Sequence, residues 1–113
     1  PINDDFKKVV FDDALPGTIA LECVFGLLCN NFTLEKTIDI LTRRKDVFEI
    51  EDCPIEIGSK ADLTIFNPEV NYVFSENHIL SSSNNCAYLD KNLKGIVYGA
   101  INNNKATLNK LWT

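Results

Sequence analysis

The sequence contains little of what several large classes of proteins require. Its 113 residues include one histidine, and no run approaches the roughly 18 consecutive apolar residues of a membrane-spanning helix. The formal net charge is −5, and the one basic cluster, residues 43–45, is three residues long. A nucleic-acid backbone is bound by releasing counterions from a basic surface, which this composition does not offer. We therefore expect neither a nucleic-acid partner nor a membrane partner.

Metal-site and redox motifs are also missing. The four cysteines, Cys23, Cys29, Cys53 and Cys86, have neither metal-ligand nor redox spacing, and His78 has no second ligand near it in the sequence. A zinc site needs three or four protein ligands. We expect His78 to be a surface residue and the cysteines to be buried or free thiols, which indicates a reducing, cytoplasmic location.

Length and composition predict a folded domain of ordinary type. The chain is 45% apolar and 24% charged, which is typical of globular proteins. It is too short for an eight-unit αβ-barrel, which needs about 250 residues.

Two helices are predicted in the first half. Residues 19–29 are almost all apolar, which predicts a helix with Thr18 as a possible N-cap and Glu22 as its lone charge. A helix without a polar face must be covered on most sides, so we expect a neighbour from outside this chain. Leu34, Ile38 and neighbouring residues have helical spacing over residues 34–43, and Thr33 is the expected cap. The two helices form an αα-hairpin.

Strands are predicted in the second half. Residues 63–66 and 70–74 predict two strands separated by a turn at Asn67-Pro68. Residues 95–101 predict a third strand, and Lys105–Leu108 a fourth that returns after a turn at residues 102–104. Helices followed by strands indicate an α+β fold.

Three blocks, in order, resemble the C-terminal part of the dihydroorotases and their close relatives, the cyclic amidohydrolases. Residues 14–22, A-L-P-G-T-I-A-L-E, are similar to the family's A-P-F-G-I-V-G-L-E. Residues 58–68, G-S-K-A-D-L-T-I-F-N-P, resemble G-x-x-A-D-L-x-x-F-D-P. Residues 81–89, S-S-S-N-N-C-A-Y-L, followed by L-K-G-I-V, resemble S-K-S-K-N-T-P-F-x…L-K-G-x-V. The ordered set covers nearly the whole chain.

The resemblance implies a fold and an activity. The family consists of zinc-dependent (β/α)₈-barrel hydrolases with a small β-sandwich, which interconvert N-carbamoyl-aspartate and dihydroorotate in pyrimidine biosynthesis. Residues 1–46 would then be an αα-hairpin and loop from the end of the barrel. Residues 47–113 would be the C-terminal part of the antiparallel or mixed β-sandwich. Zinc, its ligands and the catalytic aspartate would belong to a missing N-terminal barrel portion of the same protein, which in full-length form would be a homo-oligomer. This fragment would hold no catalytic residue and no cofactor.

The resemblance also implies three substrate-binding positions. Pro1 aligns with the proline of the family's Asp-His-Ala-Pro-His segment, so the chain would start just after the catalytic aspartate. Ile2 falls on that segment's last histidine, and Pro16-Gly17 falls on a phenylalanine-glycine pair whose backbone contacts substrate. Isoleucine cannot donate a hydrogen bond and proline has no N–H, so both positions depart from the family pattern.

Several functional interpretations remain open at this stage. One interpretation is that the chain belongs to an active hydrolase and is inert by itself; another is that it belongs to a non-catalytic paralogue with a structural or assembly role. A free-standing α+β binding domain is a third interpretation. Glu22 is either a neighbour of the active site or a carboxylate with its hydrogen bonds satisfied. Asp62 is expected to fix a turn through nearby backbone N–H groups.

Overall fold

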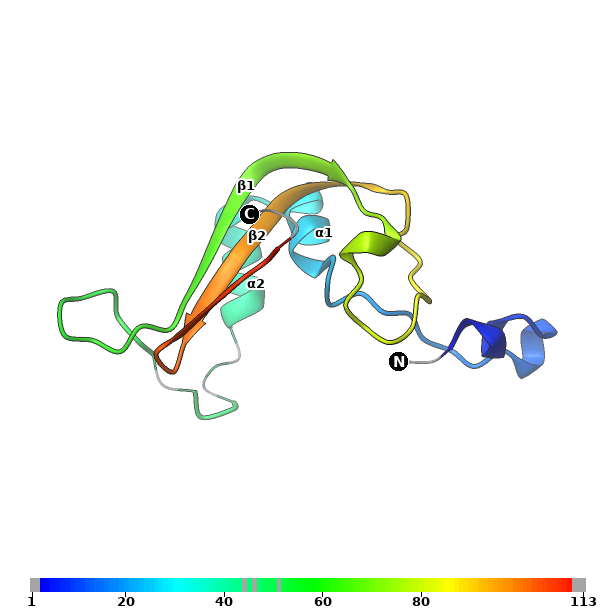
Figure 1. The fold of residues 1–113 in the computed structure, drawn as a ribbon, viewed down its shortest axis with the longest axis horizontal. Helices are drawn as coiled ribbons and strands as arrows, with labels where there is room; N and C mark the ends of the chain where they lie inside the picture. Colours follow the sequence, from blue (N-terminus) through cyan, green and yellow to red (C-terminus); the bar gives the residue numbers. More distant parts are fainter. Residues whose placement is uncertain (1–2, 44, 46, 51, 111–113) are drawn as a thin grey trace.

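The fold is α+β, with two helices followed by one antiparallel sheet. The structure, a computed structural model, describes residues 3–43, 45, 47–50 and 52–110. Its sheet has the strand order β1-β2-β3 (Figure 1). The elements are α1 (Val24–Asn31), α2 (Leu34–Thr42), β1 (Leu63–Val73), β2 (Asn92–Asn102) and β3 (Lys105–Leu108), with short 3₁₀ turns η1 (Asp4–Lys7), η2 (Phe11–Asp13) and η3 (Glu76–His78). The predicted order of helices before strands is confirmed.

The second predicted helix is confirmed, whereas the first begins later than predicted. Thr33 caps α2, because its hydroxyl accepts a hydrogen bond from the Lys36 amide at 3.3 Å. Helix α1 begins at Val24 and not at residue 19. The Ile19 amide donates instead to the Asn85 carbonyl at 2.9 Å, and Thr18 bonds to the same loop. Thr18 is therefore not an N-cap, and Glu22 precedes the helix.

Strand β1 runs through the position where a turn was predicted. Asn67 pairs with Ile96 and Asn71 pairs with Lys94, so three residues of β1 lie opposite Gly95 alone. A bulge of this kind tolerates Pro68, because the missing proline N–H falls where the ladder is already interrupted. The predicted turn at Asn67-Pro68 is therefore wrong, and the two predicted strands are one.

The predicted hairpin between the last two strands is confirmed. Asn103 and Asn104 have φ angles of 49° and 59°, which suits the tight turns that join antiparallel strands. Strand β3 then pairs with the end of β2, from Asn102 opposite Lys105 to Gly99 opposite Leu108.

Helix α1 packs against β2, and a small core lies at this contact. The fully buried members are Cys23, Phe74 and Leu93. Gly26 brings the helix backbone close to the sheet, since a Cβ there would lie 3.0 Å from Leu93 Cβ and 3.0 Å from the Tyr72 hydroxyl. The aromatic rings of Phe25 and Phe66 meet edge to face at 5.1 Å.

Much apolar surface is left uncovered around this core. The Cα radius of gyration is 16.6 Å, compared with about 13 Å for a compact chain of this length. The accessible surface is 8629 Å², compared with about 6,200 Å² for a monomer of this mass. The N-terminal turns and the loop before β1 extend from opposite ends of the molecule (Figure 1). The chain thus buries less surface than a self-contained monomer does.

Candidate functional site

The Pro16-Gly17 pair, which is named the Pro16-Gly17 turn here after its sequence chemistry, is exposed and is held through one carbonyl group. The Gly17 oxygen accepts hydrogen bonds from Lys7 Nζ at 2.8 Å and from Asn85 Nδ2 at 3.0 Å. Lys7 Nζ also donates to the Leu15 carbonyl. Gly17 has φ = 119°, a conformation that residues with a side chain rarely adopt. The third predicted substrate-binding residue, Ile2, lies outside the described residues, and the roles of all three stay predictions.

A second segment, the 81–87 loop (residues 81–87), fastens the chain that leads from this turn to α1. The Asn85 carbonyl accepts from the Ile19 amide and from the Thr18 hydroxyl, the latter at 3.3 Å. The Ala87 amide donates to the Thr18 hydroxyl at 2.9 Å. Two of the blocks that carry the family resemblance, 67 or so residues apart in the sequence, therefore lie side by side.

The side-chain carboxylate of Glu22 accepts its hydrogen bonds from the same loop. Its Oε1 atom accepts from the Ser81 amide at 3.0 Å and from the Ser81 hydroxyl at 2.6 Å. Partial burial acts to raise the pKa of Glu22. The hydrogen bonds from the Ser81 side chain and from the backbone of Glu22, Ser81 and Leu80 outweigh it, so the pKa lies below the ordinary 4.5. This geometry favours the satisfied carboxylate over the active-site neighbour.

Replacing Ser81 by alanine is expected to raise the pKa of Glu22 back toward 4.5, because the hydroxyl bond stabilises the ionised carboxylate more than the protonated acid. A folded-state pKa below the unfolded value contributes stability above the unfolded pKa, and this stability is lost as the pH falls through the folded pKa. The variant should thus be less stable at neutral pH and lose less stability than the wild type below about pH 4.5. A ¹³C titration of the Glu22 carboxyl measures the pKa.

Ser82→Ala is the matched control for this experiment, since Ser82 is exposed and is not a hydrogen-bond partner of Glu22. Equal Glu22 titration curves for the Ser81 and Ser82 variants would show that the Ser81 bond does not set this pKa.

His78 and Asp62 have structural partners that sequence reasoning did not identify. His78 Nδ1 lies 3.0 Å from the Ser75 amide and caps η3, and its ring stacks on Phe74 with centroids 5.6 Å apart. It is half-buried, so the expectation of a plain surface residue is wrong. Asp62 accepts from the Asn102 side-chain amide at 2.9 Å, which joins the ends of β1 and β2. The prediction that Asp62 fixes a turn through nearby backbone N–H groups is wrong, because its carboxylate is held by a side chain on β2.

The thiols near the core have little nucleophilic character. Burial, together with the neighbouring Cys86, raises the pKa of Cys23 to about 11. Burial also raises the pKa of Cys29. Burial raises the pKa of Tyr72 to about 12. These groups stay protonated near neutral pH and are not activated for catalysis.

The described part of the chain brings together no metal site, and the hollow beside Glu22 is small. No three histidine, cysteine, aspartate or glutamate side chains in it are grouped to hold a metal ion. The hollow beside Glu22, lined also by Phe25 and Tyr72, has a volume of about 60 Å³. That is far below the roughly 300–1,000 Å³ of ligand pockets. No helix among the described residues is long and apolar enough to cross a membrane.

Comparisons with known proteins point to one kind of enzyme. No family model matches the chain. It is 32% identical over 106 residues to a dihydroorotase from Chlorobaculum tepidum, a match that covers 88% of this chain and 24% of that protein. It is 30% identical over 112 residues to a dihydroorotase from Caldicellulosiruptor saccharolyticus, covering 93% and 26%. It is 32% identical over 115 residues to a dihydroorotase from Clostridium acetobutylicum, again covering 93% and 26%. The chain thus spans about a quarter of the length of these relatives.

Proposed function

This chain is a homologue of the dihydroorotases, and from that premise we propose that it is the C-terminal part of a longer dihydroorotase-like zinc amidohydrolase. The observation that carries the proposal is the extent of the match, which covers 88–93% of this chain but about a quarter of each relative. The longer protein would be a hydrolase of pyrimidine biosynthesis that interconverts N-carbamoyl-aspartate and dihydroorotate. This chain by itself would be inactive.

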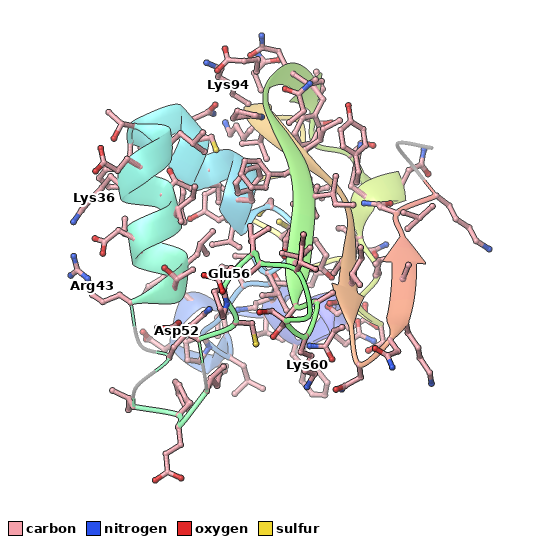
Figure 2. The ribbon with its side chains drawn as sticks, turned by 90° about the vertical axis from the view of Figure 1, so that its left-hand side faces the viewer. Lys36, Arg43, Asp52, Glu56, Lys60 and Lys94 are labelled. Carbon is pink, nitrogen blue, oxygen red and sulfur yellow. The ribbon has the colours of Figure 1, made fainter. Side chains whose placement is uncertain are left out.

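The uncovered apolar surface supports a missing neighbour. The accessible area exceeds that of a monomer of this mass by about 2,400 Å², and a standard interface buries about 800 Å² on each partner. A hollow beside the end of α2 is lined by the apolar side chains of Ile40, Leu41, Phe48 and Ile50 together with Arg43 and Lys45. On the outer side of α2, Lys36 and Arg43 both pair with Asp39, at 2.9 Å and 2.6 Å (Figure 2). Apolar side chains that gather at the surface with charged residues beside them are typical of an interface.

We propose that the N-terminal barrel portion of the same protein covers this surface. Residues 1–46 would lie on the barrel side and residues 47–113 would contribute the three-stranded sheet to a β-sandwich. The longer protein would be a cytoplasmic homo-oligomer, and the free thiols of Cys23, Cys29 and Cys86 fit a reducing compartment.

In this proposal the chemistry is divided between the two portions of the protein. Zinc, when bound, would supply a nucleophilic hydroxide for attack on the ring amide. From the family resemblance, its ligands and the proton-transferring aspartate would lie in the other portion. The contribution of this chain would be the Pro16-Gly17 turn, whose backbone would contact the substrate, together with Ile2.

A second candidate function is a structural or assembly role in a non-catalytic dihydroorotase-like protein. Two departures from the family pattern favour it. Pro16 has no backbone N–H to donate to a substrate, and Ile2 replaces a histidine that donates a hydrogen bond.

Ring opening of dihydroorotate by the longer protein tests the proposal. We expect turnover that is lost when a chelator removes the metal and restored when zinc is added, while the 113-residue chain alone shows none. A longer protein that folds, binds no zinc and does not turn over dihydroorotate would contradict the enzyme and support the non-catalytic candidate.

A further inference from the structure

The geometry points to Asn85 as a positioning residue that, with Lys7, sets the conformation of the Pro16-Gly17 turn. The inference rests on the proposed function for the role of this turn as a substrate contact. The hydrogen bonds around the turn support the positioning role of Asn85 even without that substrate contact.

One carbonyl group receives two side-chain donors from opposite parts of the chain. Lys7 reaches the Gly17 oxygen from η1, and Asn85 reaches it from the 81–87 loop. Gly17 itself is exposed and has φ = 119°. Glycine visits positive and negative φ about equally, so an exposed glycine keeps one conformation only if its neighbours hold it. The two donors therefore select the conformation of the turn.

Asn85 is suited to this task because its own backbone is fixed. Its carbonyl accepts from the Ile19 amide at 2.9 Å, and its amide donates to Ser83 Oγ at 3.2 Å. The Ser83 side chain is buried. The Asn85 side-chain amide therefore starts from a fixed backbone and loses little freedom when it bonds to Gly17.

The arrangement also leaves the exposed Gly17 amide without a protein acceptor among the described residues. In the described part of the chain, the Gly17 carbonyl is occupied by two donors, whereas the Gly17 amide donates to no protein acceptor. A fixed backbone N–H at an exposed turn can bind a carboxylate or amide oxygen without first being ordered. Loss of the Asn85 donor should consequently weaken ligand binding and leave the chemical step unchanged.

The test compares three variants of the longer protein: Asn85→Ala, Lys7→Met and the control Asn84→Ala. Asn85→Ala removes the donor to Gly17 and keeps the backbone carbonyl that pairs with Ile19. Asn84 is exposed, and its carbonyl accepts from the Cys86 amide through backbone atoms that alanine retains. Amide hydrogen exchange of Ile19 reports opening of the segment, and steady-state kinetics with dihydroorotate report binding and chemistry separately.

We expect Ile19 exchange to rise roughly fivefold in Asn85→Ala, the effect of one hydrogen bond, and to change less than about twofold in Asn84→Ala. KM should rise by a similar factor with kcat within about twofold, the signature of lost ground-state binding. Lys7→Met acts on the same carbonyl, so its effect combined with Asn85→Ala should be non-additive.

Unchanged Ile19 exchange in Asn85→Ala would overturn the inference, as would faster exchange with unchanged KM, because the side chain would then stabilise the segment without affecting its ligand. If the wild-type longer protein shows no turnover, the proposed function fails. The Ile19 exchange data alone then decide whether Asn85 sets the conformation of the Pro16-Gly17 turn.

Discussion

Replacing Gly95 by alanine should lower the free energy of opening of the sheet by about 2–4 kcal/mol. Two separate causes add at this position. Gly95 has φ = 101°, which strains any residue with a side chain. An alanine Cβ would also lie 3.0 Å from Phe25 Cε1 and 3.1 Å from Cys29 Sγ, at the contact between α1 and β2. Amide hydrogen exchange of β2 in the longer protein measures the opening free energy.

Gly58→Ala separates these two causes. Gly58 has a similar φ of 92°, but apart from its two chain neighbours no described residue has a heavy atom within 4 Å of the position its Cβ would take. The control therefore introduces backbone strain without crowding, and we expect it to cost about 1–2 kcal/mol locally and to leave β2 exchange nearly unchanged. Equal protection of β2 in both variants would mean that α1 does not approach the sheet as closely as described.

The sequence correctly predicted those elements that are stabilised by residues close to one another in the sequence. Thr33 caps α2 because its hydroxyl accepts a hydrogen bond from the Lys36 amide, only three residues further along the chain. Asn103 and Asn104 form the β2–β3 turn because asparagine tolerates positive φ. In both cases the residues that decide the structure are neighbours in the sequence.

The errors arose where distant segments override local preference. Thr18 has the chemistry of an N-cap, yet it bonds to Asn85 and Ala87, which lie almost 70 residues away. Asn67-Pro68 is a turn signal, but pairing with β2 on both sides carries β1 through it as a bulge. Asn85 and Lys7 escaped notice for the same reason, because their shared partner Gly17 is visible only in the folded chain.

The 113-residue chain produced alone should self-associate and bind hydrophobic dyes. Its core is small, and large apolar side chains across the described residues stay exposed, including Phe11 at 92% and Phe48 at 72%. Exposed apolar patches larger than a few hundred Å² are rare on monomers and drive association. The neighbour that we propose would cover part of this surface in the longer protein.

The most direct test of the central claim, that this chain is part of a longer protein that covers its apolar surface, is sizing chromatography combined with dye binding. Both are measured on the chain alone and on the longer protein. The account predicts that the chain alone elutes as associated species and binds the dye, whereas the longer protein elutes at a defined size and binds little. A monodisperse 12.7 kDa species that unfolds cooperatively and binds no dye would contradict the account and identify a self-contained domain.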